Sequence, residues 1–259
     1  MTIYVGPKRK EFIVHKKLLC ESADYFKGAF TRDFKEARKG EMYMPEDSPG
    51  AFSLYVDWLY RSAIPMANTE DHLHNLYELY FLAEKLCLVV LKDKTMDSIQ
   101  DMALKYGLKD ELITPELITK VLNNTSTRQD RLRSFCVWQM VFVYTKRSLD
   151  ESEEGEDSES EYESTFAEPG SIVLLKKDMR KVFQIGRNNF RFLDDFVIRL
   201  SGQAQVGTNN IIDPRERNEK DADDRCYFHC HKQSFNCRPS QDAEAGGSFV
   251  RKVEGNGSV

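Results

Sequence analysis

Short apolar runs separated by turn signals open the chain, a pattern typical of a small sheet with helices between its strands. Gly6-Pro7 and the basic residues after it divide the first two runs, which predicts a hairpin. Gly40 precedes a third run, and two short helices are expected before it. The expected strands are 3–5, 12–14 and 41–44; the expected helices are 15–20 and one that begins at 21–24 and turns Tyr25, Phe26, Ala29 and Phe30 toward the core.

From residue 47 onward, apolar residues recur three and four positions apart, the spacing of amphipathic helices. Ser48-Pro49 and Thr114-Pro115 are helix starts, because a capping side chain precedes a proline suited to the first turn. Further helices are expected over 72–88, 89–106 and 131–146. One or two more are expected over 172–200, where the apolar positions are Phe183, Phe190, Leu193, Phe196, Val197 and Leu200. The predicted core is Phe12, Val14, Leu18, Leu19, Phe26, Phe52, Val56, Leu59, Leu76, Tyr80 and Leu86.

Charge is unevenly distributed along the 259 residues. The net charge is -5, but nine acidic residues and no basic residue lie within 150–163, so the rest of the chain is net positive. This tract is rich in serine and cannot bury apolar area, so we expect a disordered, solvating linker. Phosphorylation of Ser148, Ser158 and Ser160 by an acidophilic kinase is the alternative use of the tract. No region is basic enough to predict a nucleic-acid partner.

The N-terminal sequence and the hydropathy pattern favour an intracellular protein, in the cytoplasm or the nucleus. The first ten residues, MTIYVGPKRK, contain no apolar signal region. No apolar run approaches the roughly 18 residues that cross a bilayer, so no membrane partner is expected. In a reducing compartment, the six cysteines are expected to be free thiols.

Motifs of enzymatic chemistry are missing from the sequence. It has no glycine-rich phosphate loop, no nucleophile elbow and no His-Glu-x-x-His. His15 opens a predicted helix and is interpreted as structural. His72 and His74 lie two residues apart and so do not share a helix face. We therefore expect a protein that is not an enzyme and needs no cofactor.

Cysteine and histidine residues gather near the C-terminal end. Three thiols and two imidazoles lie within twelve residues, at Cys226, His229, Cys230, His231 and Cys237, and could supply four zinc ligands. The spacing does not give the two ligand pairs of common zinc motifs, and the polar surroundings offer few outer-shell partners. The prediction is that Cys226, Cys230 and Cys237 are free thiols in a tail and hold no metal.

The order of residues in the first part of the chain resembles the BTB/POZ domain, in its compact fungal type. The matching residues are Val5-Gly6, Phe12, Val14-His15-Lys16, Leu18-Leu19, Ser22, Tyr25-Phe26, Phe34-Lys35-Glu36-Ala37, Met44-Pro45-Glu46-Asp47, Phe52 and Trp58-Leu59-Tyr60. The resemblance covers roughly residues 1–107. It implies an α+β fold, a short three-stranded sheet capped by a cluster of helices, that docks other proteins and carries no chemistry of its own.

Within this family, a hydrophobic-x-acidic motif before the third strand contacts the cullin scaffold of ubiquitin ligases. Phe34-Lys35-Glu36 occupies that position. An exposed phenylalanine could enter an apolar pocket while Glu36 pairs with a basic rim. The alternative is that Phe34 packs in its own core and Glu36 is solvated.

The expected organisation is a docking domain followed by attached segments. The divisions are a BTB/POZ domain at 1–107, a helical extension at 108–148, an acidic disordered linker at 149–170, a helical segment at 171–202 that packs back on the extension, and a mostly disordered tail at 203–259. Larger animal members dimerise through a segment that would precede Met1, so only weak self-association is expected. The predicted function is an adaptor that docks a partner such as a cullin; the alternative is a transcription-associated or scaffold protein with no ligase link.

Overall fold

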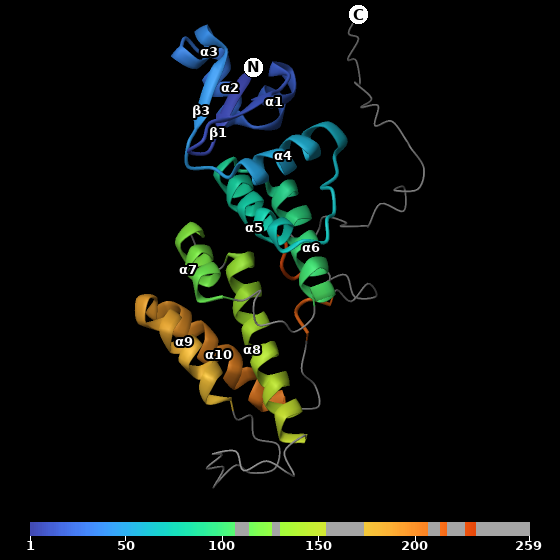
Figure 1. Ribbon diagram of the computed structural model, residues 1–259, viewed down its shortest axis with the longest axis vertical. Helices are drawn as coiled ribbons and strands as arrows, with labels where there is room; N and C mark the ends of the chain where they lie inside the picture. The colour runs from blue at the N-terminus through green and yellow to red at the C-terminus, as the bar shows by residue number, and fades with distance from the viewer. Residues whose placement is uncertain (107–113, 126–129, 154–173, 207–212, 217–225, 232–259) are drawn as a thin grey trace, which may run out of the picture.

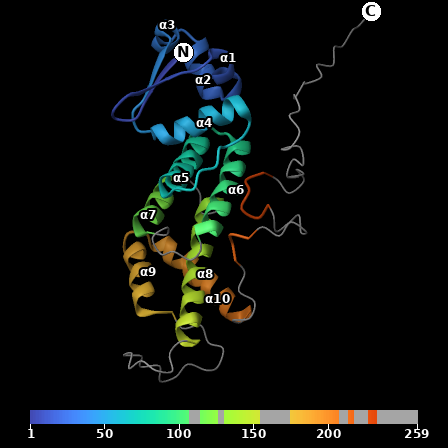
Figure 2. The same ribbon diagram turned by 45° about the vertical axis from the view of Figure 1, so that its right-hand side comes forward.

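The computed structural model describes residues 1–106, 114–125, 130–153, 174–206, 213–216 and 226–231, with a small sheet at one end and a group of helices at the other (Figure 1). The second view shows the same elongated arrangement (Figure 2). The elements are β1 (Thr2–Val5), β2 (Lys10–Ile13), α1 (Lys16–Ser22), α2 (Asp24–Thr31), α3 (Lys35–Lys39), β3 (Glu41–Met44), α4 (Pro49–Arg61), α5 (Glu70–Lys85), α6 (Val89–Tyr106), α7 (Pro115–Asn124), α8 (Arg131–Glu153), α9 (Lys176–Asn188) and α10 (Phe190–Val206).

The sheet has the strand order β2-β1-β3. β1 pairs with β2 antiparallel through the predicted hairpin and with β3 in parallel. Gly40, at φ 71°, takes the left-handed conformation that ends α3 and allows an immediate entry into β3. Its carbonyl accepts a hydrogen bond from the Thr2 N–H at 2.9 Å. The prediction of a three-stranded sheet capped by helices is confirmed.

A layer of helices covers the sheet. α4 begins at the predicted cap, where the Ser48 side chain accepts a hydrogen bond from the Ala51 N–H, and it packs against α5, which in turn packs along α6. Aromatic side chains pack between α2 and α4, where the rings of Phe26 and Tyr55 are stacked with their centroids 6.1 Å apart. The buried members of the predicted core are Val14, Leu19, Phe26, Phe52, Leu76, Tyr80 and Leu86.

Four predicted core residues are only partly buried: Phe12, Leu18, Val56 and Leu59. Tyr25, which was expected to face the core, is 42% exposed. In α4 the buried positions are Ala51, Phe52, Leu54 and Tyr55, so the buried stripe lies closer to the N-terminal end of the helix than the pattern indicated.

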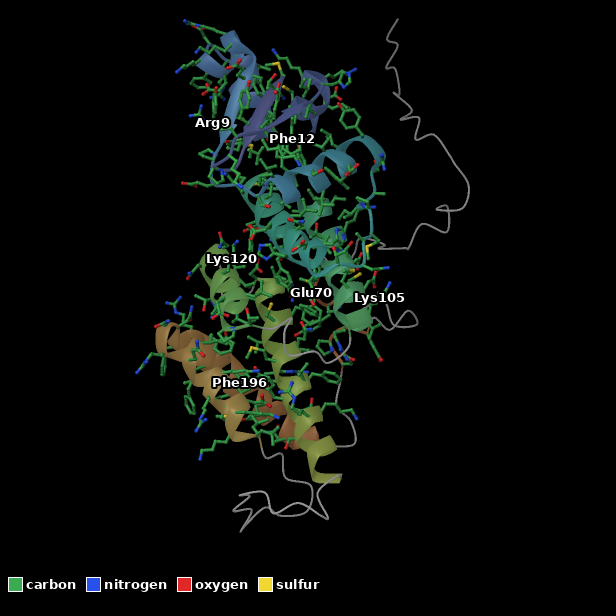
Figure 3. All side chains as sticks on the ribbon, in the orientation of Figure 1. Arg9, Phe12, Glu70, Lys105, Lys120 and Phe196 are labelled. Atoms are coloured by element: carbon green, nitrogen blue, oxygen red, sulfur yellow. The ribbon has the colours of Figure 1, made fainter. Side chains whose placement is uncertain are left out.

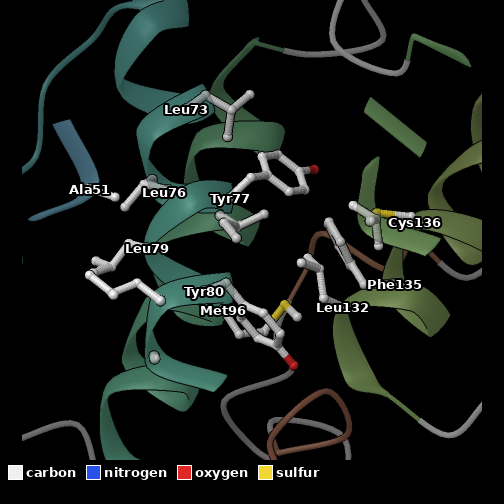
Figure 4. Close-up of a cluster of buried hydrophobic side chains, with 14 of the residues drawn as sticks. Ala51, Leu73, Leu76, Tyr77, Leu79, Tyr80, Met96, Leu132, Phe135 and Cys136 are labelled. Carbon is white, nitrogen blue, oxygen red and sulfur yellow. The ribbon is translucent and has the colours of Figure 1, made fainter. Parts of the chain in front are cut away.

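The second group of helices joins the first through α5. Figure 4 shows Tyr77 of α5 opposite Phe135 and Cys136 of α8, and these residues belong to one continuous hydrophobic cluster. Lys120 of α7, labelled in Figure 3, forms an ion pair with Glu78 of α5. α10 packs on α8 and α9, and α7 also packs on α8 and α9.

The pattern over residues 172–200 predicts one or two helices, and the described part of this segment forms two, α9 and α10. The chain breaks at Asn189, whose side-chain oxygen accepts a hydrogen bond from the Phe192 N–H at 3.2 Å and so caps α10. This break resets the helical register. Phe192 and Phe196 are buried, whereas three residues of the predicted stripe are exposed: Phe183, Phe190 and Val197.

α8 continues to Glu153, so the first residues of the predicted linker are helical. Residues 154–170 of that linker lie outside the described residues. Within the described parts of the chain, no helix has the length and apolar character needed to cross a membrane.

Candidate docking surface and a cysteine–histidine cluster

Phe34 lies on the surface, at the junction between α2 and α3. Its backbone is extended, with φ −90° and ψ 163°, and it directly precedes the first residue of α3. The Phe34 N–H donates to the Arg32 carbonyl at 2.8 Å, and the Phe34 carbonyl accepts from the Arg38 N–H at 3.2 Å. These bonds fix the backbone on both sides while 49% of the side chain stays exposed. The alternative that Phe34 is a core residue does not agree with this exposure.

The charged residues around Phe34 are of two kinds. Arg38 donates two hydrogen bonds to Asp33, at 2.8 and 2.6 Å, and this contact lowers the pKa of the Asp33 carboxyl. Glu36, in the first turn of α3, is partly buried, and its carboxylate forms no ion pair with another described residue. Lys35 is exposed. The surface therefore presents one aromatic side chain and one carboxylate that the rest of the described chain does not neutralise.

The second candidate site lies in the short segment 226–231. The structure brings together ligand atoms of Cys226, His229 and His231, all within 4.8 Å of one another. Cys230 is not in this group, because its Sγ lies 3.7 Å from the Tyr80 hydroxyl. Cys237 lies outside the described residues.

The geometry of the cluster starts from a turn in which the His229 N–H donates to the Cys226 carbonyl at 3.0 Å. Nδ1 of His229 is 3.1 Å from Nε2 of His231. The other ring nitrogen of His229, Nε2, is 3.0 Å from the carboxylate of Asp97 on α6. His229 is only 3% exposed, whereas Cys226 and His231 are partly buried.

Neighbouring residues hold the segment on the helices. Phe228 is buried, with its ring 5.3 Å from Phe135 and 5.5 Å from Trp138, both on α8. The Cys230 N–H donates to the carboxylate of Asp93 on α6. Burial raises the pKa of the Cys230 thiol. Residues 226–231 were assigned to a mostly disordered tail on their polar composition, which does not describe this packed segment.

Comparison with known proteins identifies the first part of the chain. The model of the BTB/POZ domain family matches residues 1–103. Residues 1–103 are therefore a BTB/POZ domain. The chain is similar to Kelch-like ECH-associated protein 1A of Danio rerio, with 29% identity over 58% of this chain and 26% of that protein. Kelch-like protein 40a of Danio rerio is 30% identical over 27% of this chain and 11% of that protein. The chain thus spans about a quarter or less of these relatives.

The predicted family is therefore confirmed, and the BTB/POZ domain is a protein-interaction fold that is generally not enzymatic. Phe34, Lys35 and Glu36 lie inside the matched range, as do Asp93 and Asp97 of α6. Cys226, His229 and His231 lie outside it. The cysteine–histidine cluster is therefore built from a segment beyond the BTB/POZ domain that packs on the last helix of the domain.

Proposed function

We propose that this protein is an adaptor whose BTB/POZ domain docks a cullin scaffold of a ubiquitin ligase through Phe34, Lys35 and Glu36. The observation that supports the proposal best is the half-exposed ring of Phe34 on a backbone fixed by Arg32 and Arg38. An aromatic side chain on a rigid junction needs little reordering when it enters a partner's pocket. The second partner, the one to be modified, binds the helices beyond residue 107 or the C-terminal segment.

The expected binding free energy comes from one aromatic side chain, Phe34, and the nearby carboxylate of Glu36. Fully burying a phenylalanine side chain contributes about 1.5–3 kcal/mol, and Phe34 starts half-exposed, so it can gain part of this amount. Glu36 adds selectivity, because its carboxylate can pair with a basic rim on the partner. Lys35, between Phe34 and Glu36 in the sequence, is exposed, and its positive charge disfavours a basic group of the partner close to it.

Calorimetric titration of the purified full-length chain with a purified cullin of the class that recruits BTB proteins tests the proposal. Phe34→Ala should weaken binding at least tenfold, and Glu36→Gln should weaken it less. The matched control is Phe183→Ala on α9, because this phenylalanine is 56% exposed but lies far from α3 in the sequence. The control should bind like the wild type, and all three variants should unfold at the wild-type temperature.

Two results would overturn the proposal. One is a wild-type chain that binds no cullin at micromolar concentration; the scaffold alternative with no ligase link then becomes the better account. The other is a Phe34→Ala chain with unchanged affinity, which would separate cullin binding from this surface.

A further inference from the structure

We infer that Cys226, His229 and His231 form a zinc site that fastens the C-terminal segment to α6 of the BTB/POZ domain. The inference is independent of the cullin proposal. It reverses the expectation from the sequence, which considered Cys230 and Cys237 among five candidate ligands, found few outer-shell partners and predicted that no metal is held. In the structure the set of ligands is different, and α6 supplies the missing partner.

The first argument is distance. In a tetrahedral zinc site, with Zn–N of about 2.0–2.1 Å and Zn–S of about 2.3 Å, ligand atoms lie roughly 3.3–3.6 Å apart. Nδ1 of His229 and Nε2 of His231 are 3.1 Å apart, and the Cys226 atom completes a set that fits within 4.8 Å. A shift of about 1 Å at the most distant pair brings all three onto one zinc ion.

The second argument is the orientation of His229. Its Nε2 faces the Asp97 carboxylate at 3.0 Å, so the proton of the neutral ring is held there, and Nδ1 is directed to His231. A histidine that donates its second N–H to a carboxylate is the usual outer-shell arrangement around zinc. The carboxylate fixes the ring, raises its basicity as a ligand and adds negative charge close to the cation.

The third argument is that the site is assembled by independent contacts. Phe228 fills a space between Phe135 and Trp138, and the Cys230 N–H is bound by Asp93, so the residues on either side of His229 are held without metal. The segment that carries the ligands is thus held against α6 and α8, which lowers the cost of ordering them.

The ligand chemistry selects the ion. One thiolate and two imidazoles suit zinc better than calcium or magnesium, which prefer oxygen ligands. When zinc binds, the Cys226 thiol loses its proton to solvent, and a nitrogen lone pair from each imidazole completes three bonds. The fourth position is left to a ligand that the described residues do not supply.

Metal analysis of the tag-free, full-length chain, purified without chelator, tests the inference. We expect about one zinc per chain, and loss of this zinc in Cys226→Ser, His229→Ala and His231→Ala. Cys230→Ser is the matched control from the same segment, because its side chain faces Tyr80, and it should keep the zinc. Asp97→Asn should bind zinc about 10–100-fold more weakly, since it loses only the outer-shell contact.

Cobalt substitution separates loss of ligands from loss of folding. The metal-free chain titrated with Co²⁺ should show the visible bands of a tetrahedral site and a thiolate charge-transfer band. Both sets of bands should be absent in Cys226→Ser, whose circular dichroism should still show an intact fold. A wild-type chain that takes up neither zinc nor cobalt would overturn the inference. So would zinc that persists in Cys226→Ser and His229→Ala, or zinc that is lost from a folded Cys230→Ser.

Discussion

The Tyr80 hydroxyl of α5 donates a hydrogen bond to the carboxylate of Asp130, 3.4 Å away at the start of α8. Tyr80 lies within the BTB/POZ domain, and Asp130 lies beyond it. The same carboxylate accepts hydrogen bonds from the Leu132 N–H and the Arg133 N–H, at 3.0 and 3.3 Å, and so caps α8. Lys92 approaches it to 3.5 Å. One buried aspartate therefore attaches the following helices to the domain.

Asp130→Ala should lower the free energy of unfolding by about 2–4 kcal/mol, because it removes a helix cap and leaves the buried Tyr80 hydroxyl without its acceptor. Lys92 keeps its ion pair with Glu84, which limits the loss. Urea denaturation followed by circular dichroism measures the change. The exposed Asp33 serves as the control, since Asp33→Ala breaks only a surface pair with Arg38 and should leave the midpoint unchanged. Equal midpoints for the two variants would contradict the assigned role of Asp130.

A second prediction compares two leucines of the BTB/POZ domain. Leu76 is fully buried, whereas Leu59 is only partly buried. Leu76→Ala should therefore cost about 2–5 kcal/mol of unfolding free energy, and Leu59→Ala clearly less. Both are the same chemical change on a helix, so the difference isolates burial. If Leu59→Ala proved the more damaging variant, the register of α4 would be wrong.

These two leucines also show how far the sequence could predict the fold. Both lie on apolar stripes, and periodicity alone treats them as equal, because it gives the facing side of a helix and not the depth of each position. Helix starts were predicted correctly, because a capping side chain contacts a backbone N–H only three residues away. Ser48 and Thr114 cap α4 and α7 in this way, as predicted. The position of the break at Asn189 could not be predicted, because a capping asparagine does not interrupt the apolar pattern around it.

The two candidate sites also differ in how much of each the sequence could predict. The position of Phe34 could be predicted from its neighbours in the chain, but its exposure could not, since an isolated aromatic residue is compatible with core and surface. The partner of His229 is Asp97, 132 residues earlier. The spacing of residues within 226–231 gives no information on a contact with a residue so distant in the sequence. The polar composition of the region instead favoured a tail.

Thiol chemistry provides a third prediction. Burial raises the pKa of Cys136 to about 12, whereas Cys87 is exposed. At pH 8, roughly one Cys136 side chain in 10,000 is then a thiolate, which is the reactive form. Short iodoacetamide labelling of the native chain, read by peptide mass spectrometry, should modify Cys87 and leave Cys136 untouched; labelling in urea should modify both. Rapid native labelling of Cys136 would show that the contact between α5 and α8 opens readily.

The burial of Cys136 also makes the free energy of unfolding depend on pH in the alkaline range. The unfolded chain releases the Cys136 proton near the ordinary pKa of 9, while the folded chain keeps it until about pH 12. Because the folded state then holds more protons, the free energy of unfolding should fall as the pH rises through this window. Tyr55, whose pKa burial raises to about 12, acts in the same direction from its ordinary value of 10. In Cys136→Ala the fall should begin at a higher pH than in the wild type.

His72 gives the acidic counterpart. It is 7% exposed at the start of α5, its Nε2 has no hydrogen-bond partner among the described residues, and burial lowers its pKa below 6.5. Below pH 6.5 the unfolded chain binds a proton that the folded chain does not, so the free energy of unfolding should fall as the pH drops from 7 to 5. His72→Leu should reduce this dependence, measured as the urea midpoint at each pH. His74→Leu is the control, because that side chain is exposed and lies 3.5 Å from Glu78. A His72→Leu chain that loses stability on acidification as steeply as the wild type would place the acid-sensitive group elsewhere.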